Sequence, residues 1–484
     1  MPDAESTTLE TEVLVVGGGP GGYAAAFRAA DLGKQVALVD ERDRLGGVCL
    51  LEGCVPTKAM ISAANLVRQI GAAGQMGIDV EGVSIHMQRL AAWRDRIVGD
   101  LCRAIEGLAK RRNVKVYRGR AILEDGHRAR LETEGLAPTA AAPQAVRFQQ
   151  AVLAPGAKPV FPAGLGPDGG RVLGSREALS LTTIPDRLLV VGGGYIGLEL
   201  GTCFALLGSR VTLVEMTDSL LPGTDADLVA VVQEAFGEMQ GRLYLSAKVA
   251  ALTSKADRVE ARIEVAGQGP LEETYDYALV AAGRKPNTTG LGLEAAGIES
   301  DERGFVAIDR QCRTSAGHVF AVGDCTPGPM LAHRARHQGI VAAEALAGRP
   351  TEFDPATVPA VVFCYPEIAY CGMSEPEARE QGYTVKVGRF HFRGSSRAMA
   401  RGDTKGFVKI VADAATERVL GVRMVGEGVS ELVSEAALAI EMGARLEDVE
   451  HTIHVHPTLG EAIEEAAAVA RGTALHFYRP PRKS

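Results

Sequence analysis

Two cysteines near the N-terminal end, Cys49 and Cys54, could carry out redox chemistry. They lie in the stretch GGVCLLEGCVPTK, residues 46–58. On one regular helix their axial separation would be about 7.5 Å, more than the Cα distance of about 7 Å that a disulfide bridges. A disulfide here therefore requires a distorted helix, and Gly53 gives the backbone room for the distortion. Such a strained, accessible bridge suits thiol–disulfide exchange.

Two other interpretations apply to this cysteine pair. A bare CxxxxC spacing leaves open that both cysteines are reduced, partly buried and without a role. Metal binding is the weaker interpretation, because no second cysteine pair or Cys/His cluster lies nearby in the sequence to complete four ligands. The sequence around the pair is therefore needed to distinguish a redox-active pair from two cysteines without a role.

A second segment with reactive side chains, HTIHVHPTLGEAIEEAA, spans residues 451–467. A histidine paired with a carboxylate is the usual general-base arrangement, and His456 with Glu461 fits it. His451 and His454 can instead be histidines whose hydrogen bonds are satisfied in the core. Metal binding is a weak alternative here too, since no third ligand is evident.

The element that precedes the cysteines is a complete dinucleotide-binding unit. A short apolar strand at residues 12–16 leads into a GxGxxG turn, an Ala-rich helix and a second strand at residues 35–39, which Asp40 closes. The glycines permit a tight turn, a close approach to a pyrophosphate and close helix–strand packing, and Asp40 would bind a ribose hydroxyl. The three glycines are Gly17, Gly19 and Gly22.

The same pattern recurs in the middle of the chain. Strands at residues 187–191 and 210–214 flank a second GxGxxG turn and helix, and Glu215 closes the unit. Two complete units imply two dinucleotides, of which one can be a tightly held flavin and the other an exchangeable nicotinamide. A carboxylate at Glu215 favours NAD, because it repels the 2′-phosphate of NADP. The glycines of this unit are Gly192, Gly194 and Gly197.

The remaining pattern predicts further strands and helices. Residues 60–110 are mostly helical by period, residues 135–143 form a loop, and short buried strands are expected at 151–156, 278–283 and 319–324. Asp324 ends the last of these and is placed to bind a cofactor hydroxyl. From about residue 351 the sequence pattern becomes that of an α+β domain. It predicts strands at 358–363, 368–372, 406–413 and 419–425 and an amphipathic helix at 430–442.

Composition excludes several classes of protein. The chain has 484 residues and a net charge of −8, which argues against a nucleic-acid-binding surface. No secretory signal is seen at the N-terminus, and the cysteine usage is typical of a reducing compartment, so we expect a cytoplasmic protein. The apolar run at residues 188–208 is long enough for a membrane span, but Glu199 and six glycines favour a buried strand–turn–helix.

These motifs together resemble the flavin disulfide reductases, class I of the pyridine nucleotide-disulfide oxidoreductases. The match runs from the first GxGxxG turn to the His456-Pro457-Thr458…Glu461 segment, and within the class the chain is most similar to the dihydrolipoamide dehydrogenases. The resemblance implies an α/β fold with two Rossmann-like domains, for FAD and NAD, and a C-terminal α+β dimerisation domain. The implied boundaries are 1–156 and 284–355 for the FAD-binding parts, 157–283 for the NAD-binding domain and 356–484 for the interface domain.

The resemblance also implies roles for the reactive residues. Cys49 would be the interchange thiol that meets the substrate, and Cys54 would face the flavin as the charge-transfer thiolate. Lys58 would lie near the flavin ring, paired with Glu199. In the family the acid–base histidine reaches the disulfide from the other subunit of a homodimer.

By the same resemblance, His456 would be that acid–base, oriented by Glu461. The residues implied to hold FAD are Gly17, Gly19, Gly22, Asp40, Lys58, Ala121, Gly156, Asp324 and Ala332. Those implied to hold NAD are Gly192, Gly194, Gly197, Glu215, Val249 and Gly283.

The function implied is the oxidation of protein-bound dihydrolipoamide with reduction of NAD. The partners would be the lipoyl domains of a 2-oxo acid dehydrogenase complex or of the glycine cleavage system. The nearest alternative is mercuric reductase, but it needs a C-terminal cysteine pair, and this chain ends RPPRKS. Another NAD(P)H-dependent flavin disulfide reductase is a further alternative. An alternative of a different class, a non-catalytic flavoprotein assembly subunit, would not need both the cysteine pair and the histidine–carboxylate pair.

Overall fold

The computed structural model describes residues 8–133 and 143–477. The predicted loop at residues 135–143 lies outside these residues except for its last position. The chain divides into two compact units. The first takes in residues 1–59, 88–160 and 283–354, and the second takes in residues 60–87, 161–282 and 355–484.

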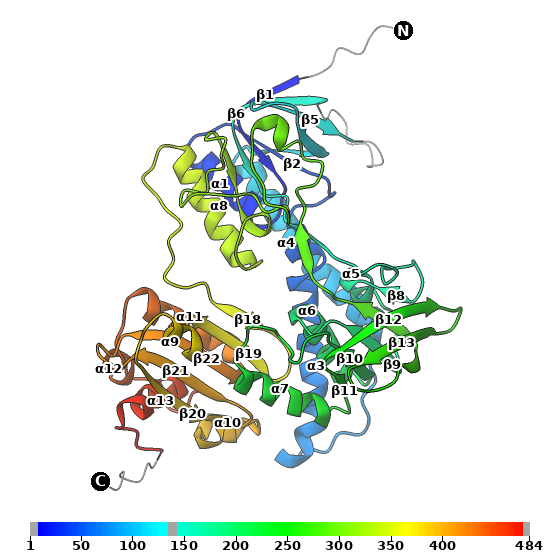
Figure 1. The fold of residues 1–484 in the computed structure, drawn as a ribbon, viewed down its shortest axis with the longest axis vertical. Coiled ribbons are helices and arrows are strands. Elements are labelled where there is room, and N and C mark those ends of the chain that lie inside the picture. Colours follow the sequence, from blue (N-terminus) through cyan, green and yellow to red (C-terminus); the bar gives the residue numbers. More distant parts are fainter. Residues whose placement is uncertain (1–7, 134–142, 478–484) are drawn as a thin grey trace. The chain divides into compact units, whose positions relative to one another are not determined.

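A seven-stranded sheet forms the centre of the first unit (Figure 1). The end of β1 is completely buried and its neighbours on both sides are parallel, as expected for a strand covered on both faces. The strands in spatial order are β3 (Lys115–Arg118), β2 (Val36–Asp40), β1 (Thr8–Val16), β6 (Ala145–Leu153), β5 (Arg128–Glu132) and β4 (Arg120–Leu123), and β17 (Val319–Ala321) pairs with the end of β6.

Two helices from distant parts of the chain lie side by side in this unit, α1 (Pro20–Asp31) and α8 (Ala332–Leu346) (Figure 1). They approach closely because both carry glycine at the contact: a Cβ atom at Gly339 would lie 2.3 Å from the carbonyl oxygen of Gly21. The other elements of the unit are α2 (Gly47–Leu51), the start of α3 (Cys54–Ala72), α4 (Met87–Arg111), and the paired strands β7 (Ala157–Pro159) and β16 (Arg284–Pro286).

The second unit contains a five-stranded parallel sheet with the second glycine turn at its centre. Its strands in spatial order are β11 (Arg242–Tyr244), β10 (Arg210–Val214), β9 (Arg187–Val191), β15 (Tyr277–Val280) and β8 (Val172–Leu173). The associated helices are α5 (Ser175–Leu179), α6 (Tyr195–Leu206) and α7 (Ala226–Glu238). A three-stranded antiparallel sheet follows, made of β12 (Ala247–Ser254), β13 (Val259–Val265) and β14 (Leu271–Tyr275).

The C-terminal part of the second unit is an antiparallel sheet covered by helices. Its strands in spatial order are β18 (Ala360–Val362), β19 (Glu367–Gly372), β22 (Val419–Gly426), β21 (Phe407–Asp413) and β20 (Val385–His391). Helices α11 and α13 pack on this sheet around one apolar core. The helices are α9 (Glu375–Glu380), α10 (Ser396–Arg401), α11 (Val429–Glu441), α12 (Leu446–Glu450) and α13 (Glu461–Arg471).

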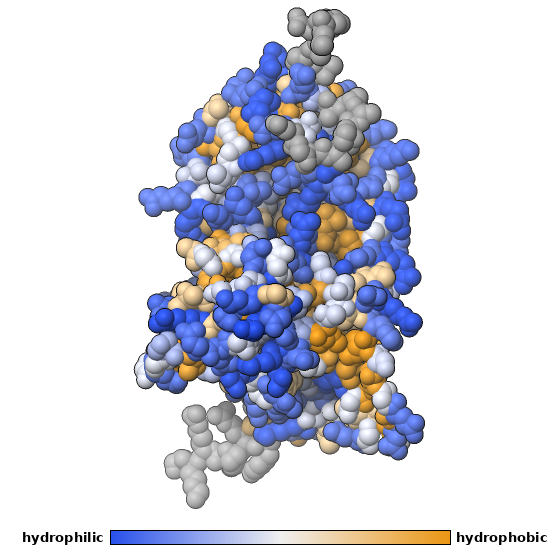
Figure 2. Space-filling model, turned by 90° about the vertical axis from the view of Figure 1, so that its right-hand side faces the viewer, coloured by the Kyte–Doolittle hydropathy of each residue, from blue (hydrophilic) through white to orange (hydrophobic). Residues whose placement is uncertain are grey.

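The face drawn in Figure 2 is mostly hydrophilic, with apolar side chains at several places. In the C-terminal part Ile453 is 96% exposed and Val455 is 74% exposed, and Leu438 and Met442 on and after α11 are exposed as well. Over the residues that the structure describes, no helix has the length and apolarity needed to cross a membrane.

The observed architecture confirms the predicted fold class, two Rossmann-like domains and a C-terminal α+β domain. The predicted strands at 187–191 and 210–214 coincide with β9 and β10. The antiparallel sheet of β12, β13 and β14 was not predicted, although β13 carries the alternating pattern of a half-buried strand, with Val259, Ala261 and Ile263 buried. The four domain boundaries stay predictions.

Candidate active site

The two cysteines lie on two separate helices. Cys49 is in the middle of α2, and Cys54 is the first residue of α3. The helix is interrupted between them, as the spacing argument requires. The backbone N–H of Glu52 still donates to the carbonyl of Val48 at 2.9 Å, and that of Thr57 donates to Gly53 at 3.0 Å. A Cβ atom at Gly53 would lie 3.1 Å from the Val48 oxygen, so this tight interruption favours glycine.

The two thiols form a hydrogen-bonded pair. The side chain of Cys49 is hydrogen-bonded to that of Cys54. This hydrogen bond, burial and the negative charge of a Cys54 thiolate raise the pKa of Cys49, while the charge of Lys58 opposes them. Cys49 therefore keeps its proton and donates it toward the Cys54 sulfur when the pair is reduced.

The start of α2 packs directly against the first glycine turn. The N–H of Gly46 donates to the carbonyl of Gly18 at 2.8 Å. Gly47 has a φ of +60°, and a Cβ atom there would lie 2.6 Å from the Cα of Gly19. Only glycines allow these two turns to approach so closely. Gly46 and Gly47 were not among the predicted site residues, although a glycine doublet shortly before a cysteine is a usable signal.

The first glycine turn has the geometry of a pyrophosphate cradle. Gly17 has a φ of +99°, and a Cβ atom at Gly22 would lie 1.8 Å from the carbonyl oxygen of Gly17. The turn ends at Pro20, the first residue of α1, whose N-terminal N–H groups favour an anion. Side chains at these glycines would collide with the backbone, so the tight turn requires glycine. A dinucleotide can approach the bare backbone of this turn closely.

Asp40 is buried at the end of β2 and stands beside this turn. Its carboxylate accepts hydrogen bonds from the N–H groups of Gly18 at 2.5 Å and Arg42 at 2.7 Å. Burial raises the pKa of Asp40, and these two hydrogen bonds oppose the rise. The hydrogen bonds orient the carboxylate, so it can accept further hydrogen bonds from a ribose.

Asp324 lies three residues after β17, beyond the carboxyl end of that strand. Burial raises the pKa of Asp324, while the charges of Arg284 and Arg334 lower it. The charge of Asp324 in turn acts on Cys49, so the two side chains share one electrostatic environment. The two arginines were not identified from the sequence.

All residues predicted to hold FAD lie in the first unit. Ala121 is buried on β4, Gly156 has a φ of +72° after β6, and Ala332 is the first residue of α8. Of the residues predicted to hold NAD, only Gly283 belongs to the first unit, and the others lie in the second.

The second glycine turn repeats the first in a more open form. Gly192 has a φ of +108°, and a Cβ atom at Gly197 would lie 2.0 Å from the carbonyl oxygen of Gly192. A Cβ atom at Gly194 would meet no atom within 4 Å. This turn can therefore accept a pyrophosphate from outside, which suits an exchangeable nucleotide.

Glu215 is buried at the end of β10, and its carboxylate is held from both sides. One oxygen accepts the N–H of Gly193 at 2.6 Å, and the other accepts the N–H and hydroxyl of Thr217 at 2.8 and 2.9 Å. This places a fixed negative charge beside the glycine turn, which suits the ribose hydroxyls of NAD and repels a 2′-phosphate.

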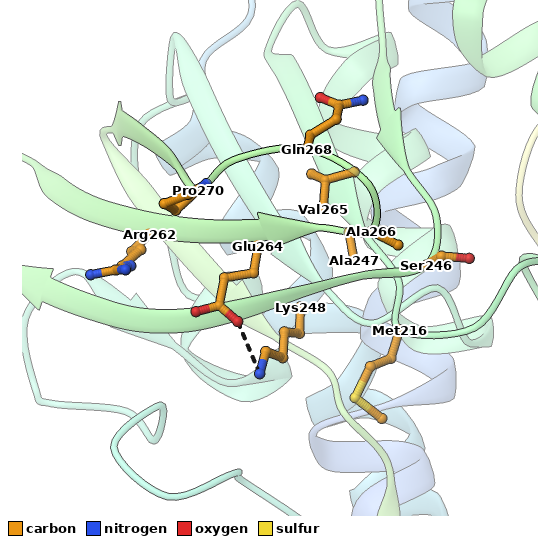
Figure 3. Close-up of a pocket in the computed structure, with 10 residues that line it drawn as sticks. All are labelled: Met216, Ser246, Ala247, Lys248, Arg262, Glu264, Val265, Ala266, Gln268 and Pro270. Carbon is orange, nitrogen blue, oxygen red and sulfur yellow. Dashed lines mark ion pairs between the residues drawn. The ribbon is translucent and has the colours of Figure 1, made fainter.

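A pocket of about 540 Å³ is lined by the sequence neighbours of Glu215 and of the predicted residue Val249 (Figure 3). Its lining includes Met216, which follows Glu215, and Lys248, which precedes Val249. Both cations in the lining face carboxylates: Lys248 pairs with Glu264 at 2.9 Å, and Arg262 pairs with Glu272 at 3.9 Å. The pocket's positive charges are thus balanced before any nucleotide binds.

The predicted base lies between α12 and α13 in the second unit. The Nδ1 atom of His456 is 2.7 Å from the Oε1 atom of Glu461, and the second carboxylate oxygen of Glu461 accepts the N–H of Thr458 at 2.8 Å. The His456 side chain is 71% exposed. Its Nε2 atom is therefore available to a substrate while Nδ1 is held.

The predicted pair of Lys58 and Glu199 is divided between the two units. Glu199 is buried on α6 and accepts the N–H of Phe363 at 3.0 Å. Lys58 belongs to the first unit and Glu199 to the second, so their pairing stays a prediction.

Comparisons with known proteins identify the family of this chain. The family described as "Pyridine nucleotide-disulphide oxidoreductase" matches residues 11–339. The chain belongs to the pyridine nucleotide-disulphide oxidoreductase family. The dimerisation domain of the same family matches residues 358–467, which include the C-terminal sheet and the His456 segment.

Individual relatives cover nearly the whole chain. A dihydrolipoyl dehydrogenase from Haloferax volcanii is 44% identical over 96% of this chain and 97% of the relative. One from Geobacillus stearothermophilus is 41% identical over 97% and 98% of the two chains. The crystal structure of LpdA from Mycobacterium tuberculosis has a TM-score of 0.86 and 31% identity, and covers 94% of this chain and 99% of that one.

Membership of this family confirms three of the predictions from the sequence. The protein is an oxidoreductase, it works with FAD and NAD, and it carries the domain through which family members form homodimers. The roles of the individual site residues stay predictions.

Proposed function

We propose that this chain oxidises the dithiol of dihydrolipoamide to the disulfide of lipoamide and reduces NAD. The observation that carries the proposal is the hydrogen-bonded pair of Cys49 and Cys54, on two successive helices of which the first packs against the first glycine turn. The similarity to dihydrolipoyl dehydrogenases over nearly the full length supports the choice of substrate. When bound, FAD supplies the two-electron link between the cysteine pair and the nicotinamide.

The chemistry begins with the substrate's protons. An ordinary thiol has a pKa near about 8.5, so few thiolates exist at neutral pH. His456, with Nδ1–H donated to Glu461, accepts the first proton at Nε2. The resulting substrate thiolate attacks Cys49 of the oxidised pair, and the Cys49–Cys54 bond breaks so that Cys54 leaves as a thiolate.

The second substrate thiol completes the exchange. It attacks the substrate sulfur of the mixed disulfide, closes the substrate's ring and releases Cys49. Cys49 leaves as a thiolate and takes up the proton that the second substrate thiol gives up, while Cys54 keeps the negative charge, in agreement with the direction of the Cys49 pKa. His456 releases the first substrate proton to solvent. Two electrons have moved from the substrate to the cysteine pair, and no atom of the protein has been consumed.

The assembly follows from the same proposal. His456 acts on the cysteine pair of the partner subunit in a homodimer, for which the dimerisation domain and the exposed Ile453 and Val455 provide the surface. The dithiol is carried by the lipoyl domain of a multienzyme complex. We infer a cytoplasmic location, because the thiol pair and the other cysteines suit a reducing compartment.

The test is the substitution His456→Ala. We expect turnover with dihydrolipoamide and NAD to fall by at least about a hundredfold, because general-base catalysis contributes about 10²–10⁴. FAD content should stay intact. His451→Ala serves as the control, because His451 is an exposed histidine five positions earlier. Near-normal turnover of His456→Ala would contradict the proposal.

A further inference from the structure

His454 is the one histidine of the segment whose side chain is enclosed. The segment between α12 and α13 has no regular secondary structure, and its apolar residues Ile453 and Val455 point outward, 96% and 74% exposed. The His454 side chain between them is only 8% exposed. The segment is therefore not anchored by apolar packing of these neighbours, and His454 supplies a polar anchor in their place.

Both ring nitrogens of His454 face oxygen acceptors. Nε2 is 2.8 Å from Glu435 on α11, while Nδ1 is 2.8 Å from the carbonyl of Thr452 and 3.2 Å from Glu464 on α13. A neutral imidazole has one nitrogen without a proton, which would face a carboxylate or carbonyl lone pair. The contacts are satisfied only when both nitrogens carry protons.

This anchor acts on the base through α13. Glu464 and Glu461 are three positions apart on the helix, so their side chains share one face. Glu464 holds His454, and Glu461 holds His456 at 2.7 Å. The contact at Gly460 is also close, since a Cβ atom there would lie 3.4 Å from the Cδ2 atom of His454. The two histidines are thus fastened to neighbouring positions of one helix.

The charge of His454 reaches the catalytic pair. Burial would raise the pKa of Glu461, but hydrogen bonds from His456 and Thr458 and the charges of His456 and His454 lower it overall. The hydrogen bond to Glu435 raises the pKa of His454, and burial opposes this rise. The charged groups that face His454 are Glu435 on α11, Glu461 and Glu464 on α13, and His456 on its own segment.

We propose that His454 is a positioning residue that stays an imidazolium between Glu435 and Glu464, holds His456 against Glu461, and sets the acid limit of turnover through its positive charge. This inference rests on the proposed role of His456 as the base. It assigns to a histidine outside the reacting pair a measurable part in the pH dependence of the reaction.

The experiment compares two charge changes of opposite sign. Loss of the positive charge in His454→Gln makes a protonated His456 more favourable, so the acid limb of the turnover profile should move to higher pH. Loss of a negative charge in Glu464→Gln should move it to lower pH. Each shift should be about half a unit or more, below the one to three units of a fully enclosed pair because His456 is exposed. Turnover of His454→Gln at its optimum should also fall by about tenfold.

The measurement is the pH profile of turnover with dihydrolipoamide and NAD on the FAD-containing protein. NADH-dependent ferricyanide reduction, which needs no thiol deprotonation, should be unchanged in both variants. His451→Gln is the matched control, because it makes the same substitution at an exposed histidine of the same segment and should shift nothing.

The outcomes separate this inference from the proposed function. Profiles of His454→Gln and Glu464→Gln that superimpose on the parent profile, or that shift in the same direction, overturn the inference. If His454→Gln loses FAD or fails to fold, the direction of the shift in Glu464→Gln decides. A His456→Gln variant measured beside them tests the base itself: if it retains turnover, the proposed function fails, whereas its inactivity beside a normal His454→Gln defeats only this inference.

Discussion

The two glycine turns of this protein have the same local geometry in different surroundings. The first glycine of each has a positive φ, +99° at Gly17 and +108° at Gly192. The residue after it donates its N–H to the acid that ends the next strand, from Gly18 to Asp40 at 2.5 Å and from Gly193 to Glu215 at 2.6 Å. Both turns thus share the positive φ and the hydrogen bond to the acid, two features of a nucleotide-binding turn that packing alone does not require.

The difference lies in what covers each turn. In the first unit, the start of the redox helix α2 comes so close that a Cβ atom at Gly47 would lie 2.6 Å from the Cα of Gly19. In the second unit, a Cβ atom at Gly194, the counterpart of Gly19, meets nothing within 4 Å. The same cradle thus serves a retained cofactor where the redox helix covers it and an exchangeable cofactor where it is open.

The largest expected effect is a complete loss of the activity that needs the cysteine pair, while the activity that needs only the nucleotide sites persists. Cys49→Ser should abolish oxidation of dihydrolipoamide, because serine cannot form the disulfide with Cys54. NADH-dependent reduction of ferricyanide should persist, because the second glycine turn and the flavin are untouched. Both activities are measured on the same preparation. Loss of both would show that Cys49 is structural and that the redox helix and the nucleotide site are not separable.

Paired substitutions at the third glycines test the retained and exchangeable roles. In Gly22→Ala and Gly197→Ala the new methyl group would lie 1.8 and 2.0 Å from a carbonyl oxygen, so each helix must move. We expect Gly22→Ala to lose most of its flavin. Gly197→Ala should keep its flavin but lose about a hundredfold in kcat/KM for NAD, since a displacement near 1 Å has an effect of this size. Flavin retention after gel filtration and steady-state kinetics measure the two effects, and the reverse pattern would contradict the assignment of the units.

The acids that end the two strands differ in length and in task. Glu215→Gln keeps the shape of the side chain but removes its charge, so the ratio of kcat/KM for NADP to that for NAD should rise by about tenfold, or about 1.4 kcal/mol. The matched change Asp40→Asn should weaken flavin retention and leave that ratio unaltered. An unchanged ratio in Glu215→Gln would mean that the charge of Glu215 does not exclude NADP.

The smallest effect concerns the cover of the first turn. Gly47→Ala introduces strain at a φ of +60° and a close contact with Gly19, so the free energy of unfolding should fall by about 1–3 kcal/mol. Gly194→Ala has room for its methyl group and should change that free energy by less than about 0.5 kcal/mol. Denaturant unfolding of both variants gives the comparison, and equal values would argue that the two turns are equally open.

The parts of the molecule that follow from short-range pattern could be predicted from the sequence. The strands on either side of the second glycine turn, the interruption of the helix between Cys49 and Cys54, and the pairing of His456 with Glu461 each depend on residues a few positions apart. Local periodicity and spacing carry that information directly.

The features that were missed depend on contacts between distant segments. The approach of Gly47 to Gly19 joins residues 28 positions apart. His454 is held by Glu435 on a different helix, so the sequence could not decide between an enclosed and an exposed histidine. His451, for which a core position was considered, is exposed. Such tertiary partners leave no periodic trace in the sequence.

The central claim is that one retained flavin and one exchangeable NAD serve a single cysteine pair. The most direct test adds dihydrolipoamide, without nucleotide and without oxygen, to extensively desalted protein and then adds NAD or NADP. We predict that the desalted protein keeps its flavin, that the dithiol changes the visible spectrum at once, and that NAD then yields about one NADH per subunit while NADP yields little. Loss of the flavin on desalting, or an unchanged spectrum with dihydrolipoamide, would contradict the account.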